Sequence, residues 1–238
     1  MTKIIRNLLR PFWRGFNILR EKDCLFFRDI KIETHRFGSE FGGWNLPVNT
    51  PPSDAVIYSA GVGFDLSFDL ELIKKRSVQI HTFDPTPKSI EWLKKQPLPK
   101  TLQHHAWGIA DYNGSAKFHL PKNPDHVSHS MVDSQTTTDE SVEVEVKTIS
   151  SIMKQLKHNR IDLLKMDIEG AEYTVLKELL KSSIRPKLLL VEFHHRFKSI
   201  GAKKTRTAVK ELRSTGYQLY YVSKTGEELC FIYKDTTE

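Results

Sequence analysis

From residue 55 onward, short apolar runs alternate with segments in which apolar residues recur at helical spacing. The apolar runs predict strands at 55–60, 78–83, 101–106, 161–166, 187–193, 218–222 and 229–233. The helical segments are 65–75, 88–96, 148–156, 171–181 and 203–214. Repeated β-α-β units predict an α/β fold with a doubly wound, mostly parallel sheet. The last two strands are joined by a Lys-Thr-Gly turn, which predicts a hairpin and hence an antiparallel strand.

Residues 116–120 and 142–147 differ from these buried runs, because polar and apolar residues alternate in them. This alternation predicts antiparallel strands with one solvated face, flanking a polar insertion. Within the insertion, Ser128 and His129 are candidate contacts to a substrate, if the insertion acts as a lid. A solvated loop is the alternative interpretation.

The segment before the main domain has a different character. We expect residues 1–50 to form an N-terminal helix and cap, and residues 51–238 the main domain. Residues 1–22 are amphipathic: Ile5, Leu8, Leu9, Phe12, Phe16 and Leu19 share one helical face. Such a helix can lie on an anionic membrane surface, or pack on the domain with its basic face in water. Both interpretations stay open.

The charge pattern narrows the choice of partners. The formal net charge is +7, and residues 1–22 contain six basic residues against one acidic residue. Because this excess is local and no nucleic-acid-binding motif accompanies it, we expect no nucleic-acid partner. The chain has no apolar stretch long enough to span a bilayer and no secretory signal pattern. Its two cysteines are isolated. A cytoplasmic protein is therefore expected, with peripheral contact to the inner membrane surface through residues 1–22 as one option.

A glycine-rich turn and a distant acid suggest a nucleoside site. Gly61 and Gly63 follow the first strand, and Asp84 follows the second, 21 residues after Gly63. That spacing suits a carboxylate that accepts hydrogen bonds from a ribose. A plain tight turn and Asp-Pro turn chemistry are the alternatives. NAD sites usually have a third glycine where this chain has Leu66, which favours S-adenosylmethionine, with backbone amides near Asp65 for its carboxylate.

Acids and histidines follow two later strands. Asp167 and Glu169 come directly after the strand at 161–166, and we expect only one of them, Asp167, to reach the cleft as a catalytic and cofactor-facing residue. Glu169 is a candidate substrate contact. Glu172 is expected to complement the dipole of the following helix. The strand at 187–193 supplies three further candidates at its end: Glu192 lies within it, and His194 and His195 follow it.

Either histidine can serve as a general base, since the pKa of a histidine lies near neutrality. Alternatively, Asp167, Glu192 and His194 can hold a divalent ion, for which Mg²⁺ is the expected choice.

These stretches resemble the FkbM family of S-adenosylmethionine-dependent methyltransferases. The resemblance runs from about residue 50 to the C-terminus and is most specific in the sequence LKMDIEGAE at 164–172. It implies the Rossmann-like class I methyltransferase sheet, with the last strand antiparallel. It also implies that Gly61, Gly63, Asp84 and Asp111 line the cofactor site and that Asp167 faces cofactor and substrate. Asp111 can equally belong to a hairpin turn. Many class I enzymes have an acid where this chain has Ser59, which is therefore a candidate contact to the cofactor.

The expected function is O-methyl transfer from S-adenosylmethionine to a hydroxyl of a sugar, glycan or glycolipid precursor. A nucleotide-dependent oxidoreductase or epimerase is the alternative within enzymes. A non-catalytic, membrane-attached scaffold with the same fold is the alternative outside them.

Overall fold

A computed structural model describes residues 14–121 and 137–234 of the chain. Its centre is a seven-stranded sheet in the order β11-β12-β10-β9-β3-β4-β5. The strands are β3 (Val56–Ala60), β4 (Gln79–Phe83), β5 (Leu102–His105), β9 (Leu163–Met166), β10 (Leu188–Glu192), β11 (Tyr217–Val222) and β12 (Glu228–Tyr233). The strand β12 runs antiparallel to both of its neighbours, β10 and β11, and the other strands of the sheet run parallel to one another. The predicted parallel sheet with an antiparallel C-terminal strand is therefore confirmed.

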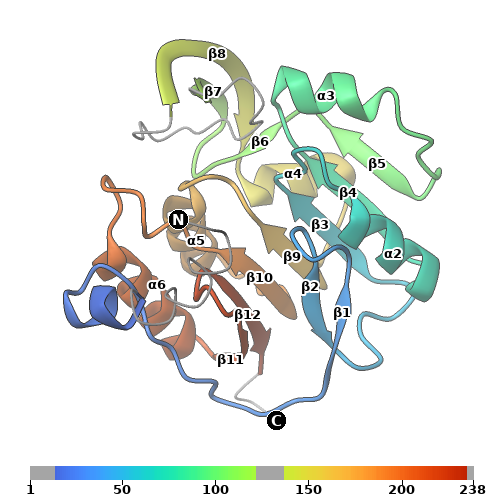
Figure 1. The fold of residues 1–238 in the computed structure, drawn as a ribbon. Helices are drawn as coiled ribbons and strands as arrows, with labels where there is room; N and C mark the ends of the chain where they lie inside the picture. Colours follow the sequence, from blue (N-terminus) through green and yellow to red (C-terminus); the bar gives the residue numbers. More distant parts are fainter. Residues whose placement is uncertain (1–13, 122–136, 235–238) are drawn as a thin grey trace, which may run out of the picture.

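Helices cover both faces of this sheet, as Figure 1 shows. They are α2 (Ser67–Arg76), α3 (Pro87–Leu93), α4 (Ile149–Leu156), α5 (Glu172–Lys181) and α6 (Ala202–Ser214). Successive strand residues point to opposite faces. In β9, for example, Leu164 packs in one core cluster with α4, α5 and α6, whereas Leu163 packs with α2 in another. Strands buried on both faces explain the continuous apolar runs in the sequence.

Helices α2 and α3 differ most from the prediction at one end. Helix α2 begins at Ser67 rather than at residue 65, and just before it the Asp65 carboxylate accepts a hydrogen bond from the Ser67 amide, which forms a turn. Helix α3 ends at Leu93 rather than at residue 96, and a proline follows at 97. The residue before a proline is driven out of the helical region.

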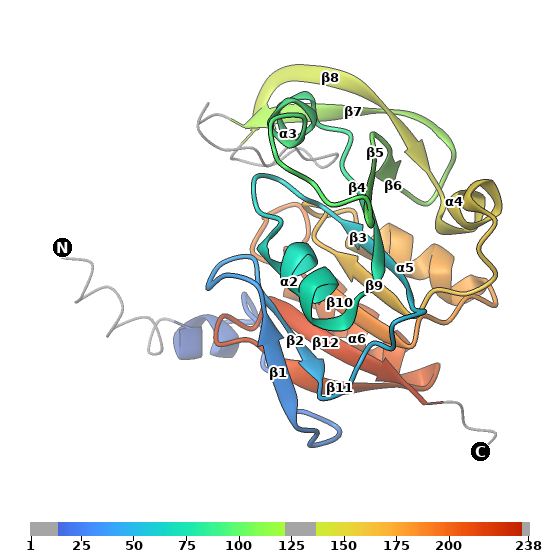
Figure 2. The ribbon, with the colours of Figure 1, turned by 90° about the vertical axis from the view of Figure 1, so that its right-hand side faces the viewer.

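A second, three-stranded sheet has the order β6-β8-β7. It is formed by β6 (Gly108–Ile109), β7 (Gly114–Pro121) and β8 (Thr137–Lys147). Strands β7 and β8 pair antiparallel, as the alternating polarity predicts. Figure 2 shows them arching over the side of the main sheet where β4 and β5 lie. Thr148 then caps α4, since its hydroxyl accepts a hydrogen bond from the Ser151 amide.

Before the main sheet, β1 (Thr34–Phe37) and β2 (Trp44–Pro47) pair as a hairpin. The expectation of a helix and a cap over residues 1–50 did not include this hairpin. Phe37, Trp44 and Leu46 are buried in one cluster with α2 and the main sheet. The hairpin thus shares the core of the main domain, and the division at residue 50 stays a prediction. No helix within residues 14–121 and 137–234 has the length and apolar character needed to span a bilayer.

Candidate active site

An open cavity lies at the carboxyl ends of β3, β4 and β9. Ligands of doubly wound sheets bind at this edge. Residues from four places in the sequence line the cavity: Gly61, Val62 and Gly63; Phe83, Asp84, Pro85 and Thr86; Gly108, Ile109 and Phe118; and Asp167, Ile168 and Glu169. Phe118 belongs to β7, so the second sheet supplies part of the wall.

The glycine turn brings β3 and β9 into close contact. Gly61 has φ +79°, and a Cβ there would stand 1.7 Å from the carbonyl oxygen of Asp167. Only glycine can occupy this position, because it lacks a Cβ and tolerates positive φ. The Gly61 carbonyl accepts a hydrogen bond from the buried ammonium of Lys165. Lys165 thus stabilises the glycine turn from the neighbouring strand β9. The sequence did not predict this role, because the position of a lysine within an apolar run does not show which residue it contacts.

Asp84 organises the same turn from the neighbouring strand. One of its carboxylate oxygens accepts the amides of Val62, at 3.1 Å, and Gly63, at 2.9 Å. The other accepts the amide and the hydroxyl of Thr86, at 2.9 and 2.7 Å. A carboxylate offers about four lone-pair directions, so these bonds engage all of them. Asp84 therefore lines the predicted nucleoside site and also makes the Asp-Pro turn contacts. A ribose would bind there by replacing some of these bonds.

Ser59 lies beneath the cavity and is fully buried. Within the part of the chain that the structure describes, its hydroxyl oxygen and one oxygen of the buried Asp69, in α2, have no hydrogen-bond partner. Burial raises the pKa of Asp69, while the positive charge of Lys165 acts in the opposite direction. The acid that many class I enzymes carry at position 59 is thus replaced by a serine with a carboxylate nearby on α2. Sequence reasoning missed Asp69, because only packing of α2 on β3 brings the two residues together.

Asp65 and Asp111 do not line the cavity. Asp65 accepts hydrogen bonds from the Ser67 amide and from the Ser39 hydroxyl, so it joins the glycine turn to the β1–β2 connection. Asp111 is exposed between β6 and β7 and contributes to raising the pKa of Glu178. The interpretation of Asp111 as a turn residue therefore fits, and a cofactor contact from its side chain does not. Ser128 and His129 lie outside the described residues.

Asp167 and Glu169 both line the cavity. The expectation that only one of them reaches the cleft is therefore wrong. Strand β9 ends at Met166, and Glu169 adopts a left-handed backbone conformation with φ +52°. Strand periodicity consequently does not apply to these positions. Glu172 shapes this turn, because its carboxylate accepts the amides of Ile168, at 2.9 Å, and Gly170, at 3.0 Å.

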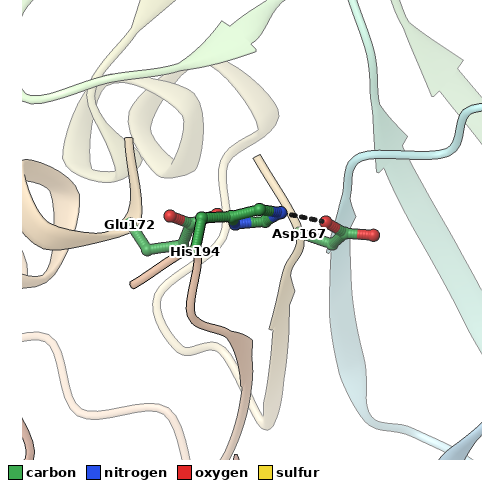
Figure 3. A group of neighbouring side chains, drawn as sticks. All are labelled: Asp167, Glu172 and His194. Carbon is green, nitrogen blue, oxygen red and sulfur yellow. Dashed lines mark hydrogen bonds and ion pairs between the residues drawn. The ribbon is translucent and has the colours of Figure 1, made fainter. Parts of the chain in front are cut away.

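His194 lies between Glu172 and Asp167, as Figure 3 shows. Its Nδ1 is 2.9 Å from a Glu172 oxygen, which is fully buried and accepts hydrogen bonds only. Nδ1 must therefore carry a proton, and in neutral His194 the free lone pair is on Nε2. That atom is 3.7 Å from Asp167 and 3.5 Å from Glu169. Both distances exceed a good hydrogen bond, so Nε2 keeps capacity for a further partner.

The charge environment favours the protonated form of His194. Burial is the largest single influence and favours the neutral imidazole. The carboxylates of Glu172, Glu169 and Asp167 together outweigh it and raise the pKa of His194 well above its ordinary value. Glu172 is in the first turn of α5, as the helix-dipole interpretation expects. Its bond to His194 gives it a second role that the sequence did not reveal.

His195 does not face the cavity. It is buried on the other side of the chain, where its Nε2 lies 3.0 Å from Asp23. Arg196 also binds Asp23, at 3.0 Å. This position does not support His195 as a base, because the residue lies in the turn after β10 and is buried against Asp23. Its role is to attach the N-terminal segment to the end of β10.

The candidate metal set is also changed by the structure. Among the described residues, the acid and histidine side chains close enough to share an ion are Asp167, Glu172 and His194, rather than a set containing Glu192. The Glu172 oxygens already accept two backbone amides and the His194 N–H. This donor set fits proton transfer better than Mg²⁺, which prefers oxygen ligands in octahedral geometry. Burial, followed by the nearby Asp167 carboxylate, raises the pKa of Glu192 to about 8.

Comparison with known proteins identifies the family of the chain. Residues 60–219 match the family described as the methyltransferase FkbM domain. A curated relative is the probable methyltransferase-like protein 24 of Rattus norvegicus, 25% identical over 178 residues, which cover 71% of this chain and 43% of the relative. The human protein of the same name is 24% identical over 178 residues, covering 71% and 42%. The chain thus spans less than half the length of these relatives.

Among solved structures, the FkbM methyltransferase of Methylobacillus flagellatus has a TM-score of 0.46 and 13% identity, covering 76% of this chain and 44% of that one. The fibrillarin pre-rRNA processing protein of Methanococcus jannaschii has a TM-score of 0.45 and 8% identity, covering 78% and 69%.

The strand order and the cavity at the carboxyl edge of the sheet define a Rossmann-like, doubly wound α/β fold with a small-molecule site. The chain belongs to the FkbM methyltransferase family, since the family match extends over more than half of its residues. The resemblance seen in the sequence is thereby confirmed.

Proposed function

We propose that the protein transfers a methyl group from S-adenosylmethionine to a hydroxyl oxygen of a sugar, glycan or glycolipid precursor. Membership of a methyltransferase family implies this donor in general. The observation that carries the proposal is the position of His194. Its Nε2 is directed at the cavity acids Asp167 and Glu169, and its Nδ1 is fixed by the buried Glu172.

The cavity fits a nucleoside donor without pyrophosphate. Phe83, Ile109 and Phe118 offer apolar walls for a base, and Asp84 offers hydrogen-bond acceptors. Gly61 leaves open the space that a Cβ would fill. Leu66 is buried at the position where dinucleotide sites need a small residue, and it packs with Val62. This packing argues against NAD and hence against an oxidoreductase or epimerase.

When bound, the donor supplies a methyl group activated by a sulfonium. The chain must then hold the acceptor in line and take its proton. His194 Nε2 would take the proton of the acceptor hydroxyl as its oxygen attacks the methyl group that the bound donor would supply. Glu172 stabilises the resulting imidazolium, because its buried carboxylate accepts the Nδ1 hydrogen bond. Since only neutral His194 accepts a proton, turnover should rise with pH towards its raised pKa.

The acids around Nε2 support a polyhydroxylated acceptor. Asp167 and Glu169 can accept hydrogen bonds from neighbouring hydroxyls and so orient a sugar ring. We include a cytosolic location in the proposal, since both cysteines are unpaired and buried.

The test has two stages. Calorimetry should show binding of S-adenosylhomocysteine, and Asp84→Ala should weaken it by at least about tenfold, as expected for loss of hydrogen bonds to a charged group. Transfer of labelled methyl groups to a panel of sugars and glycolipids should then follow. His194→Gln should lower turnover by about 10²–10⁴-fold while leaving cofactor affinity within about twofold. Binding of NAD(P) instead would support the oxidoreductase, and binding of neither cofactor would support the scaffold.

A further inference from the structure

Residues 14–19 are helical and contact the domain through Arg14. Arg14 donates hydrogen bonds to the carbonyls of Cys24, at 3.0 Å, and Lys224, at 2.9 Å. It also lies 3.8 Å from the buried Asp23. Two apolar residues of this helix are open to solvent, since Phe16 is 48% exposed and Leu19 84% exposed, whereas Ile18 is partly buried. A surface helix usually buries its large apolar residues, so the exposure of these two is unusual.

The next segment continues the same surface. Cys24 is buried and Phe26 packs against the main core, so these side chains point inward. Leu25 and Phe27 alternate with them and point outward, with 55% and 73% of their surface exposed. In an extended segment with one solvated face, polar residues would be expected at such positions. Single exposed apolar residues are ordinary, but four large ones between residues 16 and 27 indicate a contact surface.

The charges beside these four residues are mainly basic. Arg20, Lys22 and Arg28 are exposed. The start of α6 lies next to the segment, because the Cys24 thiol contacts the Ala202 carbonyl at 3.4 Å, and Figure 1 shows the helix beside α6. There α6 adds exposed Lys203, Lys204 and Arg206. The nearby acids Glu21 and Asp29 are paired with Arg206 and Arg213.

We propose that Phe16, Leu19, Leu25 and Phe27 insert into an anionic lipid surface, with the neighbouring lysines and arginines against its headgroups. Apolar side chains flanked by basic residues are the combination that binds such surfaces. A zwitterionic surface, or an uncharged protein partner, would leave the basic residues unmatched.

The proposed surface lies at the edge of the sheet that holds the active site. Asp23 binds His195, which directly follows the catalytic His194. Arg14 binds the β11–β12 turn, and Glu227 of that turn accepts the Phe193 amide. Membrane contact here would bring the cavity close to the bilayer. The acceptor would then be a hydroxyl of a lipid-linked molecule, an extension that rests on the proposed function.

Vesicle flotation of the full chain tests the lipid surface without any need for activity. The probes are phosphatidylcholine vesicles with and without one part in three of phosphatidylserine, about the anionic content that attracts polybasic segments. The wild-type chain should float with the anionic vesicles, and sodium chloride at about 0.5 M should weaken binding. A variant with serine at Phe16, Leu19, Leu25 and Phe27 should lose at least about tenfold in affinity. Because all four side chains are exposed, its thermal unfolding should match that of the wild type.

The matched control replaces two exposed apolar residues elsewhere, Leu70→Ser and Tyr112→Ser, and should float like the wild type. Equal flotation of the four-serine variant and the wild type would overturn the proposal, as would absence of flotation for both. Light scattering provides the remaining outcome. If the wild type is a dimer, the four-serine variant is a monomer and neither binds vesicles, the surface is a contact between two copies of the chain. Loss of lipid binding with methyl transfer retained on water-soluble sugars would leave the proposed function intact.

Discussion

Glu172→Gln is the substitution that most directly tests the role given to His194. In the structure, one Glu172 oxygen accepts both His194 Nδ1–H and the Ile168 amide, and the other accepts the Gly170 amide. Glutamine has nearly the same shape but only one accepting atom. The change therefore removes a charge-assisted hydrogen bond, worth about 1.5–3 kcal/mol. It also places the glutamine NH₂ group, which cannot accept, next to one buried backbone amide, and leaving that amide without an acceptor costs about 1–3 kcal/mol. Glu172 is fully buried, so solvent does not weaken these effects.

We expect the variant to be less stable to urea by about 3–5 kcal/mol at pH 6, in line with the cost of breaking a buried charge pair. The pH dependence follows from the raised pKa of His194. A group whose pKa is higher in the folded than in the unfolded state adds stability below its unfolded pKa, near 6.5. That stability is lost as pH rises through the folded pKa. The difference between wild type and Glu172→Gln should therefore shrink on going from pH 6 to pH 9.

The assay that isolates His194 is an NMR titration of its imidazole, assigned by the signal missing in His194→Gln. The wild-type signal should titrate above pH 6.5, and in Glu172→Gln the pKa of His194 should fall, because one of three nearby negative charges is gone. Glu178→Gln is the matched control, since Glu178 is on the same helix and one of its carboxylate oxygens lacks a partner in the structure. An unchanged pKa of His194 in Glu172→Gln, or a wild-type pKa below 6.5, would refute the arrangement.

Two further predictions concern Gly61, in the glycine turn, and Asp69, in the helix α2 that follows it. Gly61→Ala should lower the melting temperature and the yield of folded protein, because its Cβ would stand 1.7 Å from the Asp167 carbonyl oxygen and φ is +79°. Gly15→Ala, with nothing within 4 Å, should leave both unchanged, and equal behaviour of the two variants would contradict the close approach. Asp69→Asn should be more stable than the wild type at neutral pH, because burial raises the pKa of Asp69 and the wild type then loses stability as pH rises from the unfolded pKa near 4. The melting temperatures of Asp69→Asn and the wild type should differ more at pH 7 than at pH 4. An equal difference at both pH values would contradict the buried environment of Asp69.

Local features of the sequence were sufficient to predict most of the fold. Apolar runs of strand length, separated by helical periodicity, predicted every strand of the main sheet and its antiparallel end. These strands can be recognised in the sequence because a strand that is buried on both faces of a sheet needs a continuous apolar run. The β1–β2 hairpin was not predicted. Its strands are only four residues long, and they are stabilised by packing on α2 rather than by a pattern of their own.

The site divides in the same way. Gly61, Gly63 and Asp84 were identified from their spacing, because the turn and its capping acid are set by local chain geometry and by two adjacent strands. The choice between His194 and His195 could not be made from sequence. Both residues lie after the end of β10, and only their tertiary partners, Glu172 for His194 and Asp23 for His195, separate them.

The sequence by itself determined the order of strands and helices, the glycine turn with its acid, and the family. Tertiary structure alone decided that Glu172 lies under His194 and that Arg14 attaches its helix to the β11–β12 turn. The physical reason is distance along the chain. Periodicity and turns depend on residues a few positions apart, whereas His194 and Glu172 are 22 residues apart, and Arg14 and Lys224 are 210 apart. Such contacts exist only once the sheet has brought its strand ends together.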